Sequence, residues 1–142
     1  HVVPGRFERI EVNGVPTLLD GAHNPQKIQA FAEAYRLAYP ETPCVIVAAF
    51  GKNKTDSVDQ LFSILRTLSS HLIVTEFTVE GAGTKGSLDC TMLSGVAQEA
   101  GFGDVITEND PHAALAQATE WAHAQDGMVI VTGSFYLVSM LR

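Results

Sequence analysis

The segment VPTLLDGAHNPQKIQAFAEAY, residues 15–35, contains the change of pattern that decides the fold. Its first five residues form a largely apolar run that is typical of a strand. Asn24 is a good helix cap, and Pro25 suits a first helical turn. The apolar residues that follow recur at helical spacing: Ile28, Phe31, Ala32 and Tyr35. The pattern therefore predicts a strand that runs into a helix through the short turn 20–24.

An antiparallel hairpin is predicted immediately before this turn. Residues 7–12 alternate apolar with charged side chains, and Asn13-Gly14 is a dipeptide typical of a tight hairpin turn. Because the turn leads directly into the strand at 15–19, we expect the two strands to pair at the edge of a sheet.

Strand and helix patterns then alternate to the end of the chain. Residues 43–50 form a continuous apolar run, as expected for a strand buried on both faces. The other predicted elements are a helix at 61–68, a strand at 71–77, a glycine-rich loop at 81–86, a helix at 88–100, a strand at 105–107, a helix at 111–124, a strand at 128–132 and a helix from Phe135. This βαβα order predicts an α/β fold, a Rossmann-like three-layer sandwich, with a mostly parallel sheet of about six strands and an antiparallel N-terminal edge hairpin.

Three loops of this fold follow strands that run in the same direction. They are the segments 20–24, 51–56 and 132–134. Ligands of open α/β sheets gather at the carboxyl ends of the strands, so we expect the three loops to share one edge and to form the site there.

Composition limits the class of protein and its partners. The 142 residues predict one globular domain, 1–142, with 46% hydrophobic and 18% charged residues. The formal net charge of −7 argues against nucleic acid and anionic membranes as partners. No apolar stretch approaches the roughly 20 residues that cross a bilayer. We expect a cytoplasmic protein whose two cysteines are free and buried.

Common nucleotide and hydrolase motifs do not occur where the corresponding folds need them. No G-x-G-x-x-G follows the first strand, G-x-x-x-x-G-K-[ST] does not occur, and residues 51–55 (GKNKT) lack the spacing of a phosphate loop. Gly133-Ser134 follows a strand, but Tyr136 stands where a nucleophile elbow needs its second glycine. A Rossmann oxidoreductase and a serine hydrolase are therefore poor interpretations.

The turn DGAHNP, residues 20–25, carries the most chemistry. Asp20 at a strand end can accept hydrogen bonds from a ribose diol, as acidic residues do in nucleotide sites. A purely structural interpretation is also open. In that interpretation Asn24 caps the helix, Pro25 fits the first turn and His23 is a partly exposed bystander.

Three motifs resemble a known family in their order and spacing. They are PGRFE at 4–8, DGAHNP at 20–25 and VTGSFYL at 131–137. The chain is similar to the C-terminal domain of folylpolyglutamate synthases, including the bifunctional dihydrofolate synthases, within the Mur ligase superfamily. The resemblance implies an ATP-dependent ligase of folate biosynthesis, which phosphorylates a carboxylate and lets the amine of L-glutamate attack the acyl phosphate.

The same resemblance implies a partner domain and cofactors. In this family a central, N-terminally placed ATP-binding domain holds the P-loop and most ligands of Mg²⁺, and that domain is expected to be absent from this chain. The C-terminal domain closes over it as a lid. We therefore expect ATP, Mg²⁺, folate and L-glutamate as ligands of the complete enzyme and no activity from the isolated domain.

The resemblance also implies roles for individual residues. Arg6 would contact the nucleotide, Asp20 would hold the ribose hydroxyls and His23 would lie at the reacting centre as the catalytic residue. Lys54 and Ser134 would bind substrate carboxylates, although Asn53 and Thr55 replace the acids that flank this lysine in many relatives. No residue is assigned to a metal.

Other interpretations of the chain stay open. Ser134 can equally be a simple helix cap, and the aromatic pair Phe135 and Tyr136 is predicted to pack in the core and against another domain. For the function, the alternatives are a Mur-type ligase domain of peptidoglycan synthesis and a noncatalytic module that binds a nucleotide or an amino acid.

Overall fold

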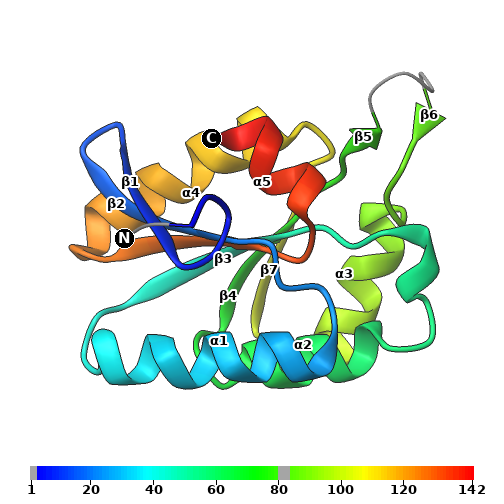
Figure 1. Ribbon diagram of the computed structural model, residues 1–142, viewed down its shortest axis with the longest axis horizontal. Coiled ribbons are helices and arrows are strands. Elements are labelled where there is room, and N and C mark those ends of the chain that lie inside the picture. Colours follow the sequence, from blue (N-terminus) through cyan, green and yellow to red (C-terminus); the bar gives the residue numbers. More distant parts are fainter. Residues whose placement is uncertain (1–2, 80–83) are drawn as a thin grey trace.

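A six-stranded sheet runs through the middle of the molecule and carries helices on both faces (Figure 1). This computed structural model describes residues 3–79 and 84–142. The strand order across the sheet is β1-β2-β8-β3-β4-β7. The strands of this sheet are β1 Glu8–Val12, β2 Val15–Asp20, β3 Cys44–Ala48, β4 His71–Val74, β7 Asp104–Thr107 and β8 Met128–Thr132. The predicted fold class is confirmed.

The N-terminal hairpin forms as predicted. β1 pairs antiparallel with β2, whereas β2 pairs parallel with β8. Asn13 and Gly14 have φ angles of 52° and 77°, so both adopt the left-handed conformation that a tight hairpin turn requires. β1 is therefore the antiparallel edge strand of an otherwise parallel sheet.

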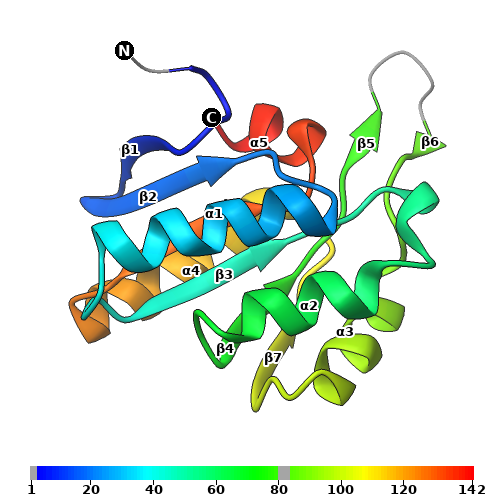
Figure 2. The same ribbon diagram turned by 60° about the horizontal axis from the view of Figure 1, so that its bottom comes forward.

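The helices divide into two layers, one on each face of the sheet (Figures 1 and 2). One layer holds α1 Pro25–Ala38, α2 Val58–Arg66 and α3 Cys90–Glu99, and the other holds α4 Pro111–Gln125 and α5 Phe135–Leu141. Both layers bury apolar side chains against the sheet, so every residue of β3 and of β8 is buried. This explains why these two strands are continuous apolar runs in the sequence.

The carboxyl ends of β2, β3 and β8 meet at one edge of the sheet. Asp20 pairs with Thr132 and Thr132 with Ala48 in the strand register. Beyond the strands, the Gly133 N–H donates a hydrogen bond of 3.1 Å to the Ala22 carbonyl. The predicted convergence of the loops is therefore present.

The chain between β4 and α3 differs from the prediction. The strand expected at 71–77 ends at Val74, and β5 Thr78–Val79 then pairs antiparallel with β6 Thr84–Lys85 in a separate ribbon. The prediction of a surface loop at 81–86 is wrong at 84–85, and 81–83 lie outside the described residues. The Phe77 N–H donates to Ser87 Oγ (3.0 Å), and the Gly86 N–H donates to the Phe77 carbonyl (3.1 Å). These hydrogen bonds join the two sides of the ribbon and stabilise its paired conformation.

Within the described ranges 3–79 and 84–142, no helix combines the length and the hydropathy that crossing a bilayer would require.

Both cysteines are buried and free, as predicted. Burial, together with the neighbouring Glu76 carboxylate, raises the pKa of the Cys90 thiol to about 11, and burial also raises the pKa of Cys44. Only the thiolate is a good nucleophile. We therefore expect iodoacetamide to modify both thiols much more slowly in the folded protein at neutral pH than in the urea-unfolded chain, as measured by mass spectrometry. Modification of Cys90 at the rate of the unfolded chain would contradict this expectation.

Candidate functional site

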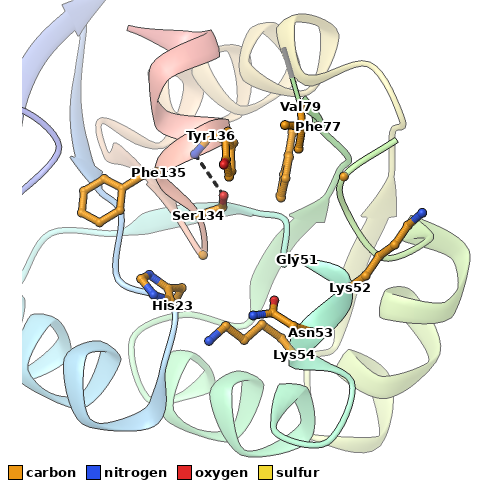
Figure 3. Close-up of a pocket in the computed structure, with 12 residues that line it drawn as sticks. His23, Gly51, Lys52, Asn53, Lys54, Phe77, Val79, Ser134, Phe135 and Tyr136 are labelled. Carbon is orange, nitrogen blue, oxygen red and sulfur yellow. Dashed lines mark hydrogen bonds between the residues drawn. The ribbon is translucent and has the colours of Figure 1, made fainter. Parts of the chain in front are cut away.

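Two cavities open beside the carboxyl edge of the sheet. The first has a volume of about 400 Å³ and is bordered by the β2–α1 turn, the β3–α2 loop, the β8–α5 turn and the β5–β6 ribbon (Figure 3). His23, Lys54 and Ser134 form part of its polar lining, and Phe77, Val79 and Tyr136 are apolar lining residues. Lys52 lines it as well, so this cavity combines hydrogen-bonding groups and two lysine cations with an aromatic wall.

The second cavity, of about 290 Å³, lies against α1 and the segment before β1. Arg6, Asp20 and Lys27 line it together with the apolar side chains of Phe7, Ala22, Ala30, Phe31, Ala34 and Phe135. The predicted site residues are thus divided into two groups. His23, Lys54 and Ser134 line the first cavity, whereas Arg6 and Asp20 line the second.

The His23 ring is oriented by a backbone carbonyl. Its Nδ1 lies 3.0 Å from the Gly21 carbonyl oxygen, which can only accept a hydrogen bond. Nδ1 therefore carries the hydrogen, and in the neutral ring Nε2 is the atom that can accept a proton. The next residue, Asn24, caps α1, because its Oδ1 accepts from the Lys27 N–H (2.8 Å). The turn thus contains both the predicted cap and an oriented imidazole.

Asp20 joins two segments of backbone. One carboxylate oxygen accepts from the Phe7 N–H and the other from the Ala22 N–H, both at 2.9 Å. Burial raises the pKa of Asp20 above its ordinary value, although these hydrogen bonds and the charge of Arg6 oppose the rise. Asp20 therefore has a structural role that the sequence alone did not reveal. Each carboxylate oxygen has a further lone pair, so this role is compatible with binding a ribose hydroxyl.

The raised pKa of Asp20 has a consequence for stability. The folded protein holds the Asp20 proton more tightly than the unfolded chain, so the stabilising effect of protonation is fully present below the unfolded value of 3.8 and is lost as the pH rises through the folded pKa. We expect the difference in free energy of unfolding between wild type and Asp20→Asn to shift in favour of wild type as the pH falls from neutral toward 3.8. Urea denaturation at several pH values measures this difference, and a shift in the opposite direction would contradict the prediction.

Several contacts hold the segment that carries Arg6. The Gly5 N–H donates to Glu8 Oε1 (2.8 Å), and Arg142 pairs with the same oxygen at 3.2 Å. The Gly21 N–H donates to the Gly5 carbonyl (2.8 Å). Phe7 adopts φ 45° in the left-handed region, which is unusual for a non-glycine residue. These contacts connect the PGRFE motif to the DGAHNP motif and to the C-terminal helix.

The loop after β3 forms a short 3₁₀ helix, Lys52–Lys54. Both lysines of this helix line the first cavity, but the Lys54 side chain extends toward His23, whereas the Lys52 side chain extends away from His23 (Figure 3). Asn53 also lines this cavity, and Thr55 Oγ1 donates to the Lys52 carbonyl at 3.0 Å. Of the two residues that flank Lys54, Asn53 therefore faces the cavity and Thr55 stabilises the turn.

Ser134 begins the last helix. Its Oγ accepts from the Tyr136 N–H (3.0 Å), so the simple helix cap is present. The side chain is only slightly exposed and also lines the first cavity, where its hydroxyl hydrogen can still be donated. A role in binding a substrate carboxylate stays a prediction.

The prediction for the aromatic pair after Ser134 is wrong in one respect. Phe135 and Tyr136 are 39% and 54% exposed, so they do not lie in the core. Tyr136 stacks on Phe77, with ring centroids 5.6 Å apart, and both rings border the first cavity. Helical spacing contained the signal that was missed, because a helix that buries Leu137, Val138 and Leu141 turns its first two residues outward.

The side chains fit part of a nucleotide site better than a metal site. An apolar wall with two cations and one acid in the second cavity suits a base, a ribose and an anion. Asp20 is the one carboxylate among the described lining residues of the two cavities, and Mg²⁺ prefers an oxygen-rich cage. Elsewhere in the described part of the chain, donor atoms of Glu76, Asp89 and Cys90 lie within 4.8 Å of one another, but Asp89 caps α3 and Glu76 accepts from the Cys90 N–H.

Comparisons with known proteins agree with the three sequence motifs. The chain is 28% identical over 138 residues to the dihydrofolate synthetase of Saccharomyces cerevisiae. The aligned region covers 96% of this chain and 32% of the relative. A structure of Mycobacterium tuberculosis folylpolyglutamate synthase complexed with ADP and AMPPCP superposes with a TM-score of 0.80 at 25% identity, over 96% of this chain and 30% of that one. Thermotoga maritima folylpolyglutamate synthase gives a TM-score of 0.81 at 26% identity, over 99% and 30%.

The chain thus spans about a third of the length of these relatives. The family model described as "Mur ligase, glutamate ligase domain" matches residues 5–135, which include the first motif from Gly5, the whole of the second motif and the third motif up to Phe135. The resemblance predicted from the sequence is confirmed. The chain therefore belongs to the Mur ligase family, as a glutamate ligase domain.

Proposed function

We propose that this chain is the C-terminal lid domain of an ATP-dependent ligase that adds L-glutamate to a folate through an acyl phosphate. The observation that carries the proposal is the pair of cavities at one sheet edge. One has the lining expected for a nucleoside, the other has the lining expected for an amino acid, and the His23 turn lies between them. The similarity to enzymes named folylpolyglutamate synthase and dihydrofolate synthetase supports glutamate and folate as the substrates.

In this proposal the second cavity binds the nucleoside part of ATP. The base packs on the apolar wall that includes Phe31, and Asp20 accepts hydrogen bonds from the ribose hydroxyls. Arg6 and Lys27 are the cations of this cavity, and they attract the phosphates. Lys27 lies in the first turn of α1, just after the DGAHNP motif, and the sequence interpretation did not assign it to the site.

The first cavity binds the incoming amino acid and contains the reacting groups. A carboxylate oxygen of the folate attacks the γ-phosphorus of ATP and ADP leaves. The glutamate amine then attacks the acyl carbon, inorganic phosphate leaves and the nitrogen loses a proton. Lys54 and Ser134 bind a glutamate carboxylate, and Nε2 of His23 accepts the proton from the amine or orients the acyl phosphate.

A second domain completes this site in the proposal. A P-loop domain of the same protein holds the phosphates and most ligands of Mg²⁺, which neutralises phosphate charge when bound. The lid alone then binds ATP weakly and does not turn over, because most of the phosphate contacts belong to the other domain. A cytoplasmic location of the complete enzyme stays part of the proposal.

The test is a ligation assay on the protein expressed from its complete reading frame. Tetrahydrofolate and dihydropteroate are offered as acceptors with ATP and L-glutamate, and phosphate release and the amide product are followed. We expect glutamate-dependent phosphate release with at least one of the two. Ligation only to a nucleotide-linked peptidoglycan precursor would support the Mur-type alternative, and no ATP hydrolysis with any acceptor would support a noncatalytic binding module.

The two lysines of the 3₁₀ helix provide a matched pair of variants. We expect Lys54→Ala to raise the KM for L-glutamate about tenfold with a smaller change in kcat, because a charge-assisted hydrogen bond to a carboxylate is lost. Lys52→Ala removes the same charge from the same turn, but its side chain extends away from His23, so we expect a smaller rise (Figure 3). Steady-state kinetics measure both, and equal effects would indicate general electrostatic attraction rather than direct binding by Lys54.

A further inference from the structure

Phe135 occupies an unusual place between the two cavities. It is the first residue of α5, and it is the one side chain that lines both cavities among the residues the structure describes. Its ring is 39% exposed, although Phe is normally a core residue. Phe135 and Tyr136 extend to opposite sides of Ser134, with Tyr136 toward Phe77 and Phe135 toward the His23 turn (Figure 3). A simple packing role for Phe135 does not explain this position.

The Phe135 ring packs against two glycines, Gly5 and Gly21. A Cβ added to Gly21 would lie 2.3 Å from Phe135 Cδ1, and one added to Gly5 would lie 3.1 Å from Cε1. The ring therefore rests directly on the backbone of the PGRFE and DGAHNP segments. Both glycines are joined by the hydrogen bond from the Gly21 N–H to the Gly5 carbonyl. The three motifs of the family thus meet at this one side chain.

The ring of Phe135 also contacts the imidazole of His23. Their centroids are 6.0 Å apart with an interplanar angle of 67°, an edge-to-face arrangement that is favourable for aromatic pairs. A single hydrogen bond from Nδ1 to the Gly21 carbonyl fixes one point of the imidazole but not the rotation of the ring about that bond. Phe135 packs against one side of the ring. Together the two contacts determine the direction in which Nε2 points.

We propose that Phe135 is a positioning residue that orients the His23 ring and separates the nucleotide cavity from the amino-acid cavity. The inference rests on the proposed function, because it assumes that His23 acts on the reacting groups. It assigns no chemistry to Phe135 itself, which has no group that can transfer a proton. Its effect is to keep Nε2 directed at one place while both substrates are bound.

The test uses the protein from the complete reading frame with four variants. Phe135→Tyr keeps the aromatic ring, Phe135→Leu keeps most of the side-chain volume, and Phe135→Ala removes both. Gly21→Ala keeps the Phe135 side chain but displaces its ring, because the added Cβ would clash with it. Leu37→Ala is the control, because Leu37 is a large apolar side chain on α1 that is 86% exposed. For each protein we measure kcat, the KM for ATP, the KM for L-glutamate, the midpoint of thermal unfolding and the ¹⁵N spectrum of the His23 ring.

We expect Phe135→Ala and Gly21→Ala to lower kcat at least about tenfold with a smaller change in the KM for ATP. In both variants the ¹⁵N signals of His23 should shift or broaden, because the ring loses the contact that restricts its rotation about the Nδ1 hydrogen bond. Phe135→Tyr should keep kcat within about twofold, because the edge-to-face contact is retained. Phe135→Leu should resemble Phe135→Ala in kcat while keeping more of the thermal stability.

Two results would overturn the inference. One is a kcat of Phe135→Ala equal to that of Leu37→Ala. The other is a set of His23 signals that are unchanged in both Phe135→Ala and Gly21→Ala. If the wild-type protein ligates no glutamate, the proposed function fails, yet the His23 spectra still decide whether Phe135 orients the ring. Failure of the inference and failure of the proposed function are therefore distinguishable.

Discussion

Replacing His23 with alanine is expected to lower the kcat of glutamate ligation at least about hundredfold, because general acid–base groups contribute about 10²–10⁴ to a rate. The Nδ1 hydrogen bond to the Gly21 carbonyl directs the proton-accepting Nε2 away from the backbone, and the side chain lines the amino-acid cavity. The KM for ATP should change much less, since Arg6 and Asp20 line the other cavity. Steady-state kinetics on the complete protein give both constants.

A second histidine provides the matched control for this variant. His112 is exposed in the first turn of α4 and is not among the described residues that line either cavity. His112→Ala removes an imidazole without touching the candidate site, so we expect kcat to stay within about twofold of wild type. If His23→Ala behaves like His112→Ala, the ring is not at the reacting centre, and the bystander interpretation of His23 becomes the better one.

Gly133→Ala is expected to destabilise the fold by at least about 3 kcal/mol, because backbone strain and a steric clash occur together. Gly133 has φ +107°, a conformation that L side chains rarely adopt. An added Cβ would also lie 2.3 Å from the Ala49 carbonyl oxygen and 2.9 Å from Phe50 Cε1. Both neighbours belong to the buried end of the β3 segment, so neither can move without disturbing the core. Urea denaturation measures the loss.

Two other glycines separate the causes of this effect. Gly14 has φ +77° with open space around its Cα, so Gly14→Ala tests backbone strain alone and should cost about 1–2 kcal/mol. Gly95 lies within α3 and also has open space, so Gly95→Ala should stabilise the fold by about 0.5–1 kcal/mol through helix propensity. A cost of Gly133→Ala no larger than that of Gly14→Ala would show that the β3 segment yields to the new methyl group.

The position of Gly133 links stability to the site. It allows the turn after β8 to pass directly over the end of β3, and its N–H reaches the Ala22 carbonyl at 3.1 Å. Ser134 and Phe135 follow at once, so the same close approach brings a lining residue of each cavity to the edge of the sheet. A variant that opens this turn should therefore also weaken ligand binding at both cavities.

The order and type of nearly every element could be predicted from the sequence, because these depend on local patterns. The Asn13-Gly14 turn, the cap at Asn24 and the apolar runs of the inner strands each act within a few residues. Parallel strands then bring their carboxyl ends to one edge, so the segments of the site could also be predicted. The motif spacing was sufficient to indicate the family.

The grouping of the site residues into two cavities could not be predicted, because it depends on tertiary packing. The Asp20 carboxylate reaches the Phe7 N–H, and Phe135 rests on Gly5 and Gly21, through contacts that join segments far apart in the chain. No local pattern encodes such contacts, since they depend on how the layers pack. The division into two cavities with Phe135 between them, and the β5–β6 ribbon that borders the first, are therefore properties of the packed structure rather than of any motif.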